Sequence, residues 1–244
     1  EVADGLLKLW IMPKSLTEMP ASQYVIGGDI AAGTGATPTC ASIADVRTGT
    51  KVGEWQNANI YPNDAAPFVM ALCLLFKDEF GTGAKLVWET PGPGLVFGAV
   101  ITKLGYRNVY WRREEEVLWR PRRAKMFAGW PANPKLILSL HENYRDALTK
   151  RKFCNLSQAA LEETLNFVYD GSSITYKRRG IANADASGAH AFHGDIVVAD
   201  ALANFLMDDY EPQAKAVPEA RHLDERSLAG RRLRRQREME ESYP

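Results

Sequence analysis

The segment YVIGGDIA, residues 24–31, is the feature of the sequence that most constrains the fold. It is a short apolar run that ends in small residues, and such runs are typical of a strand buried in the centre of a sheet. Two more strands are predicted at residues 39–46 and 51–60, with a turn between them at residues 47–50. The core is therefore expected to begin with a meander of three strands.

Helices and strands alternate after the meander. Apolar residues at helical spacing and capping signals predict helices at residues 64–80, 95–104, 133–150, 157–165 and 195–208. Short apolar runs predict strands at residues 85–89 and 107–111, and a hairpin at residues 167–176 that turns at Asp170-Gly171. An antiparallel meander followed by parallel strands and helices is the order of a ribonuclease H-like α/β fold, in which helices flank a mixed sheet. The hairpin is an addition to that plan.

The length and composition favour one α/β domain with extensions. A chain of 244 residues, of which 45% are hydrophobic, can bury a sizeable core. Residues 1–20 contain two prolines and no sustained period, which predicts a linker or an N-terminal arm, and the first residue, Glu1, suggests a domain excised from a longer protein. Residues 21–211 are the predicted ribonuclease H-like domain. Residues 212–244 are polar and charged, which favours a disordered tail.

Nothing in the sequence indicates a membrane or a secreted protein. No apolar run approaches the length of a membrane span, and no basic segment precedes an apolar one as in a signal peptide. The cysteines, Cys40, Cys73 and Cys154, are odd in number and far apart, which fits neither a disulfide framework nor a zinc site. We therefore expect a reducing, cytoplasmic compartment and no membrane partner.

The charges balance overall but not along the chain. There are 30 lysines and arginines and 30 acidic residues, so the net charge argues neither for nor against a nucleic-acid partner. Basic residues gather between Lys103 and Lys125, where tyrosines and tryptophans are interleaved, and again at residues 231–237. Either run can equally be a solvated surface.

Three acidic residues fall at the carboxyl ends of the predicted strands, where an open α/β sheet places its sites. Asp29 ends the first strand, Glu89 ends the fourth, and Asp195 opens the last long helix. Three carboxylates this close repel one another unless a divalent cation neutralises them. Hard oxygen ligands favour Mg²⁺ or Mn²⁺, and two such ions about 3.5–4 Å apart can activate a water and stabilise the leaving oxygen of a phosphodiester.

Each of these residues also has a plainer interpretation. Asp29 could serve the adjacent glycine-rich turn by a hydrogen bond, and Glu89 could be a surface residue before a turn. Asp195 could be a helix N-cap. His193 could orient a water or contact phosphate, or it could be an ordinary loop histidine. The joint pattern of the acids, rather than any one of them, favours a catalytic metal site.

Six segments, taken together and in order, carry a resemblance to a known family. They are GGDIAAGTG (27–35), VWETPGPG (87–94), GYRNVYWR (105–112), GWPANPKLILSL (129–140), EETLNFVY (162–169) and HGDIVVADALA (193–203). The chain resembles the nuclease domain of the large terminase subunit of tailed bacteriophages. Each segment alone is a weak signal, and six in the family's order are a fairly specific one.

The resemblance implies a metal-dependent endonuclease that cuts double-stranded concatemeric DNA during genome packaging in the host cytoplasm. It implies that Asp29 bridges two ions, Glu89 holds one and Asp195 the other, with the portal protein and the small terminase subunit as partners. The family often has an acid after the first glycine-rich turn, where this chain has Ala36-Thr37, and two acids in the last motif, where it has Gly194-Asp195. Each departure removes a possible ligand, so weaker metal affinity is expected.

DNA binding requires cations near the metal ions, because the phosphate backbone dominates affinity. The first candidates are Lys177, Arg178 and Arg179, followed by Arg112, Arg113, Arg122 and Arg123. No segment resembles a helix that reads bases, so contacts to phosphate rather than to bases are expected. The packaging ATPase of the full family protein is expected to be absent, because the chain contains no G-x-x-x-x-G-K-S/T motif.

Three other functions stay open. A different ribonuclease H-like nuclease, such as a Holliday junction resolvase or a transposase, has a related arrangement of acids. An actin-like phosphotransferase is suggested by residues 29–35, which resemble the phosphate-binding turn of sugar kinases, although 244 residues are few for the two domains that such enzymes need. A non-catalytic DNA-binding or assembly module would leave the acids without metal.

Overall fold

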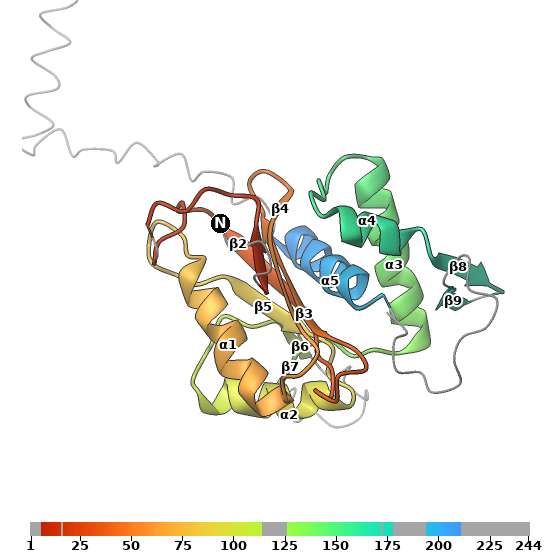
Figure 1. The fold of residues 1–244 in the computed structure, drawn as a ribbon, viewed down its shortest axis with the longest axis horizontal. Coiled ribbons are helices and arrows are strands. Elements are labelled where there is room, and N and C mark those ends of the chain that lie inside the picture. Colours follow the sequence, from red (N-terminus) through yellow and green to blue (C-terminus); the bar gives the residue numbers. More distant parts are fainter. Residues whose placement is uncertain (1–5, 16, 114–125, 172, 178–193, 211–244) are drawn as a thin grey trace, which may run out of the picture. The chain divides into compact units, whose positions relative to one another are not determined.

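The computed structural model describes residues 6–15, 17–113, 126–171, 173–177 and 194–210 (Figure 1). The described residues up to Asp209 belong to one compact unit. The strands are β1 Leu7–Leu9, β2 Tyr24–Asp29, β3 Thr39–Asp45, β4 Thr50–Asn57, β5 Lys85–Trp88, β6 Trp111–Arg113, β7 Met126–Ala128, β8 Phe167–Asp170 and β9 Ser173–Tyr176. The helices are α1 Pro62–Leu75, α2 Pro93–Lys103, α3 Pro134–Thr149, α4 Gln158–Thr164 and α5 Asp195–Asp209. No helix in this part of the chain is long and apolar enough to cross a membrane.

Five of the strands form one mixed sheet in the order β1-β4-β3-β2-β5. β2, β3 and β4 are antiparallel neighbours and form the predicted meander, whereas β5 pairs with β2 in parallel. β2 has a neighbour on each side, and this central position explains why its sequence is an almost continuous apolar run. The predicted fold class, a ribonuclease H-like mixed sheet flanked by helices with an added hairpin, is confirmed.

The two faces of the sheet are covered by different helices, as Figure 1 shows. Ile26, Trp55 and Trp88 point to the face that packs against α1 and α2, and they belong to the main hydrophobic core. The opposite face packs against α5, which lies so close to β2 that a Cβ atom on Gly27 would come within 2.1 Å of the carbonyl oxygen of Ala199. Because side chains alternate along a strand, the residues of β2 at even numbers face α1 and α2, and those at odd numbers face α5.

The first residues of the chain contribute an edge strand. The sequence predicted a linker or an arm at residues 1–20, and within that segment Leu7–Leu9 forms β1, which pairs with β4 in antiparallel register. Three residues are too few to show a periodic pattern, so the sequence contained no strand signal there. The predicted domain limits at residues 20 and 211 stay predictions.

The prediction of a strand at residues 107–111 was wrong. The backbone of this segment meets β5 at a single bridge, Leu86 with Val109, and Trp111 belongs instead to the separate β6–β7 pair. The chain leaves β5 here because Trp130 takes the next place along its edge: the Trp130 N–H donates to the carbonyl of Trp88 at 2.8 Å. Residues 107–111 therefore split between two partners: Val109 bridges to β5, and Trp111 pairs with β7.

The predicted starts of two helices are confirmed by their caps. The side chain of Asn133 accepts a hydrogen bond from the backbone N–H of Leu136 at 3.0 Å, and the hydroxyl of Ser157 accepts one from Ala160 at 3.3 Å. Both bonds satisfy an N–H group that has no partner inside the first turn of a helix. The first long helix, α1, ends at Leu75 rather than at residue 80.

Candidate functional site

Asp29 and Glu89 end neighbouring parallel strands on the same face of the sheet. Asp29 is the last residue of β2, and Glu89 directly follows β5. Gly27 is paired with Val87 in register, so the residues two positions later in each strand are neighbours as well. Gly27 faces α5, and the period of two therefore directs the side chains of Asp29 and Glu89 toward the α5 side.

Asp195 approaches from α5, which runs against the direction of β2 and β5. The last residue of this helix, Asp209, lies beside the start of β5, with 2.6 Å between its Oδ2 and the Nζ of Lys85. The first turn of α5 must then lie toward the carboxyl ends of the two strands. Gly194, buried and with a φ of 81°, makes the turn into the helix.

The pKa values show that these acids lie within electrostatic reach of one another. Burial raises the pKa of Asp29 well above its usual range, and the charges of Asp195, Glu89 and Glu163 raise it further. A hydrogen bond from the backbone N–H of Ile30 acts in the opposite direction. Burial also raises the pKa of Glu89. The fold therefore gathers carboxylates in a place where water screens their repulsion poorly.

Glu163, on α4, is a fourth acid that the sequence analysis did not single out. Burial raises the pKa of Glu163 to about 7, and the charges of Asp195 and Asp200 add to that shift. Its Oε2 atom is buried and accepts no hydrogen bond from the described residues. Ala160, one turn earlier on α4, packs against the first residues of α5 and against Cys40, the cross-strand partner of Asp29. This contact brings Glu163 to the same corner.

A weak sequence signal for Glu163 did exist. Ser157 caps α4 and Ala160 is its buried residue, so a side chain three positions after Ala160 shares the inward face. Glu163 also lies within the segment 162–169 that supports the family resemblance. The sequence could not show that this inward face points at an acid from another helix.

The four acids do not form a ready-made metal cage. Within the described residues, no three His, Cys, Asp or Glu side chains converge closely enough to hold an ion. The donor set nevertheless fits a hard divalent cation, because every candidate ligand is a carboxylate and Oε2 of Glu163 is buried without a hydrogen bond. Burial is the main reason that the pKa of Asp29 is raised, and a bound cation would offset the repulsion that adds to it.

The predicted DNA-binding residues lie partly outside the described residues. His193, Arg178, Arg179, Arg122 and Arg123 fall in segments that the structure does not describe. Lys177 follows β9 on the surface, where its Nζ lies 3.5 Å from Oδ2 of Asp170. Arg112 and Arg113 belong to β6, and the guanidinium of Arg112 lies 5.2 Å from the ring centre of Phe127. Within the described part, neither Lys177 nor Arg112 forms an ion pair with the four acids. Their roles in DNA binding stay predictions.

Known protein structures match the fold of the chain. No protein-family model and no curated protein sequence matches it. The large terminase nuclease of the thermophilic phage G20c superposes with a TM-score of 0.59 at 18% identity, over 82% of this chain and 87% of that one. The same nuclease with bound magnesium gives a TM-score of 0.58 at 18% identity, over the same shares of the two chains. The large terminase nuclease domain of Thermus phage P74-26 gives 0.52 at 18% identity, over 80% of this chain and 89% of that one. The resemblance predicted from the six segments is thus confirmed at the level of the fold.

Proposed function

We propose that this chain is a divalent-metal-dependent endonuclease that cuts double-stranded concatemeric viral DNA during genome packaging. The observation that carries the proposal is the position of Asp29, half-buried at the carboxyl end of the interior strand β2 and within electrostatic reach of Asp195, Glu89 and Glu163. The likeness to large terminase nucleases, one of them solved with magnesium, supports the same reading. Partners such as the portal protein and the small terminase subunit, and a place in the host cytoplasm, belong to this proposal.

The acids have distinct parts in the proposed site. Asp29, which interacts electrostatically with each of the other carboxylates, would contact both metal ions, whereas Glu89 and Asp195 would each hold one. Two Mg²⁺ or Mn²⁺ ions would supply an activated water and charge stabilisation at the leaving oxygen. The rigid ends of β2 and β5 hold Asp29 and Glu89 at a fixed separation, and α5 holds Asp195 above them. Glu163, whose pKa is about 7, can hold or release a proton beside Asp195 near neutral pH.

The DNA itself would be held by cations around this corner. Lys177, Arg112 and Arg113 remain candidates, together with Arg178, Arg179, Arg122 and Arg123. Contacts of these side chains with phosphate would make binding independent of sequence and sensitive to salt. His193, two residues before Asp195, would orient a water or contact phosphate.

A plasmid cleavage assay tests the proposal. The protein is incubated with supercoiled plasmid and Mn²⁺ or Mg²⁺, with and without EDTA, beside the variants Asp29→Ala and Asp195→Ala. We expect metal-dependent, largely sequence-independent cleavage that falls by about a hundredfold or more in both variants. The matched control is Asp146→Ala, which removes an exposed acid on α3 that pairs with Lys150, and it should cut like the wild type.

Two results would contradict the proposal. Cleavage that either Asp29→Ala or Asp195→Ala leaves unchanged would show that the acids are not the catalytic site. Hydrolysis of ATP by the chain without cleavage of DNA would favour the actin-like phosphotransferase instead. Circular dichroism of each variant shows whether a loss of activity reflects a loss of folding.

A further inference from the structure

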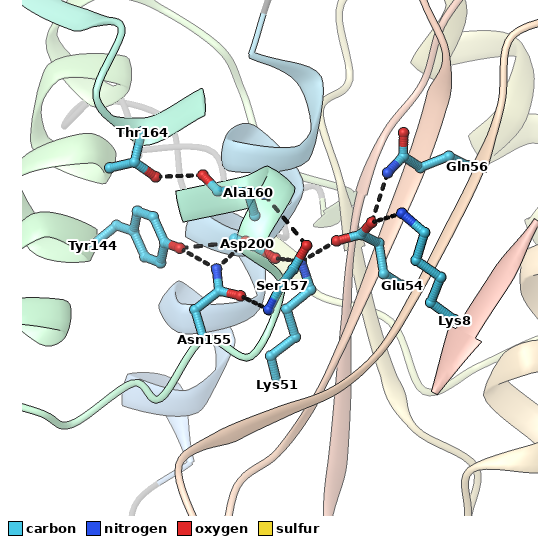
Figure 2. Close-up of polar contacts among 10 residues, drawn as sticks. All are labelled: Lys8, Lys51, Glu54, Gln56, Tyr144, Asn155, Ser157, Ala160, Thr164 and Asp200. Atoms are coloured by element: carbon cyan, nitrogen blue, oxygen red, sulfur yellow. Dashed lines mark hydrogen bonds and ion pairs between the residues drawn. The ribbon is translucent and has the colours of Figure 1, made fainter. Parts of the chain in front are cut away.

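A largely buried ion-pair network, in which Lys8 at 3.4 Å from Glu54 is the exposed member, lies between the sheet and the helices that carry two of the acids. Lys51 on β4 is at its centre, with Nζ 2.7 Å from Oε2 of Glu54 and 2.7 Å from Oδ1 of Asp200 (Figure 2). The side chains of Lys51 and Asp200 are 0% exposed and that of Glu54 is 1% exposed. One buried cation thus joins strand β4 to helix α5.

An irregularity in the sheet places Lys51 in this position. The register between β3 and β4 shifts after the pair of Ile43 with Gly53, and Lys51 is then paired with Ala44, so that Val52 is an extra residue. Val52 packs into the core beneath α1 and α2, whereas Lys51 and Glu54 share the opposite face. In a regular strand, residues three apart would point to opposite faces. The bulge is therefore what brings the ammonium group beside Glu54 under α5.

The carboxylates of the network are held by further partners from other segments. Oδ2 of Asp200 accepts hydrogen bonds from Nδ2 of Asn155 at 2.7 Å and from the hydroxyl of Tyr144 at 3.3 Å. Oε1 of Glu54 accepts one from Nε2 of Gln56 at 2.7 Å. Figure 2 shows that the side chains of Tyr144, Asn155 and Asp200 lie together and are joined by hydrogen bonds. The network is well satisfied, which makes its geometry specific.

The same network reaches the start of α4. Ser157 caps α4 and donates a hydrogen bond to Glu54, which helps to lower the pKa of that carboxyl. The backbone N–H of Lys51 also donates to the carbonyl of Cys154 at 2.9 Å, just before the cap. Glu163 lies at the end of this short helix, and Asp200 lies little more than one turn after Asp195 on α5. The network therefore links β4 to both helices that carry acids of the proposed site.

Stability alone does not account for such a network. Removing charges from water is costly, and a well-packed apolar cluster of the same volume is often as stable as a buried ion pair or more stable. A buried ion pair does, however, accept one geometry, whereas apolar side chains tolerate sliding. α5 meets Gly27 of β2 through its own small residues Ala199 and Ala203, and such contacts do little to fix the position of the helix along its axis.

We propose that Lys51, Glu54 and Asp200 are positioning residues that fix α5 and α4 against the sheet, so that Asp195 and Glu163 face Asp29. The inference rests on the proposed function, since the purpose of the alignment is a carboxylate site for divalent metal ions. It assigns the buried network a role in metal binding although none of its members lies at the strand ends. Residues that orient metal ligands commonly change metal affinity by about 10- to 100-fold.

The test compares two double variants, each of which replaces one lysine of the sheet and one aspartate of α5. Lys51→Met/Asp200→Asn removes the buried ion pair, and Lys85→Met/Asp209→Asn removes the exposed pair at the other end of α5. In the first variant we expect the Kd for Mn²⁺ to rise about tenfold and kcat for plasmid cleavage to fall about tenfold, with KM for DNA nearly unchanged. The control should stay within about twofold of wild type, as is usual for exposed pairs.

Hydrogen exchange gives a readout that does not depend on activity. Amides of residues 157–165 and 194–203 should exchange about tenfold faster in Lys51→Met/Asp200→Asn than in the control, at a temperature well below unfolding. If the double variant does not fold, the isosteric Asp200→Asn, which leaves Lys51 paired with Glu54, should show the same changes to a smaller degree. A purely structural role would lower the Tm and leave the Mn²⁺ Kd and kcat as they are, and that result would overturn the proposal.

The outcomes separate this inference from the proposed function. If the wild type neither binds Mn²⁺ nor cuts DNA, the proposed function fails, and hydrogen exchange still decides whether the network positions the helices. Exchange equal to that of the Lys85→Met/Asp209→Asn control overturns the positioning role. Faster exchange together with weaker Mn²⁺ binding supports both.

Discussion

At Gly194 the backbone and two aromatic rings leave no room for a side chain. Its φ of 81° is a conformation that residues with a Cβ atom rarely adopt, and a Cβ there would come within 2.4 Å of Phe167 and 3.1 Å of Tyr176. The large terminase family often has an acid at this position of the last motif. The local structure therefore explains why Asp195 is preceded by glycine here.

This leads to a prediction for Gly194→Asp. The variant should lose at least about 2 kcal/mol of unfolding free energy, because it adds backbone strain and a clash with Phe167. It should gain no Mn²⁺ affinity, as judged by calorimetry. Ala36→Asp is the matched control at the other position where the family often has an acid. Ala36 is exposed, so this change should alter stability by less than about 0.5 kcal/mol. Tighter Mn²⁺ binding by a stable Gly194→Asp variant would show that the space argument is wrong.

Glu163 makes a prediction about pH. Burial and the neighbouring acids raise the pKa of Glu163 from 4.5 to about 7, so the folded protein keeps a proton there that the unfolded chain has already lost. The free energy of unfolding of the metal-free protein should therefore fall as the pH rises from 4.5 to about 7. The raised pKa of Asp29 acts in the same direction.

Thermal unfolding in EDTA across that pH window measures the effect. Glu163→Gln, which cannot ionise, should show a smaller fall of Tm with pH than the wild type. Glu162→Gln, an exposed neighbour on the same helix, should follow the wild type. Equal slopes for Glu163→Gln and Glu162→Gln would mean that the Glu163 carboxyl does not titrate in this range.

At the scale of the elements, the closeness of α5 to β2 decides where Asp195 lies. A Cβ on Gly27 would come within 2.1 Å of the Ala199 oxygen and 2.5 Å of the Ala203 nitrogen, both of them backbone atoms. Such atoms cannot turn aside as a flexible side chain can, so α5 would have to move away from the sheet. The first turn of α5, with Asp195, would move with it.

Gly27→Ala is therefore expected to reduce stability and cleavage together. The overpacking should cost about 2 kcal/mol or more, measured by urea unfolding, and plasmid cleavage should fall at a temperature where the variant is still folded. Gly28→Ala is the control one residue along the same strand. A Cβ on Gly28 has its nearest neighbour at 3.5 Å, which is ordinary contact, so its effect should be small. Similar losses in the two variants would show that the distance between α5 and β2 is not the cause.

At the scale of the whole molecule, the acids make folding and metal binding interdependent. The folded chain gathers Asp29, Glu89, Asp195 and Glu163, whereas the unfolded chain separates them. A cation that binds the folded form stabilises it by RT ln(1 + [L]/Kd), which is about 2.7 kcal/mol at a hundredfold excess over Kd. Mn²⁺ should accordingly raise the Tm of the wild type near pH 8, and EDTA should reverse the rise.

The same measurement on Asp29→Asn supplies the control. This variant removes the acid that interacts electrostatically with all three others, so its Tm should respond little to Mn²⁺. Its Tm in EDTA should be no lower than that of the wild type, because the substitution also removes a repelled buried charge. A Tm of the wild type that is independent of Mn²⁺ and EDTA would contradict a metal site formed by these acids.

What could be predicted from the sequence was local. The run at residues 24–31 had to be a central strand, because its length and apolarity leave few other solutions, and the caps Asn133 and Ser157 marked helix starts by their own hydrogen bonds. Asp29 and Asp195 were found as candidates because strand ends and helix starts can be recognised within a few residues. Their positions at strand ends and at a helix start made these acids candidates for a site, and their metal-binding role stays a prediction.

Tertiary structure decided what depends on contacts between distant segments. Residues 107–111 have the composition of a strand, yet Trp130 occupies the edge of β5 that they would have extended. Glu163 joins the other acids because α4 packs on α5, and Lys51 is buried beside Glu54 because a bulge changes the face on which it lies. The sequence determined the elements and the acids at their ends, since short-range geometry is written in consecutive residues. Only packing could decide which charges meet, since the free energy of a buried charge depends on partners far away in the chain.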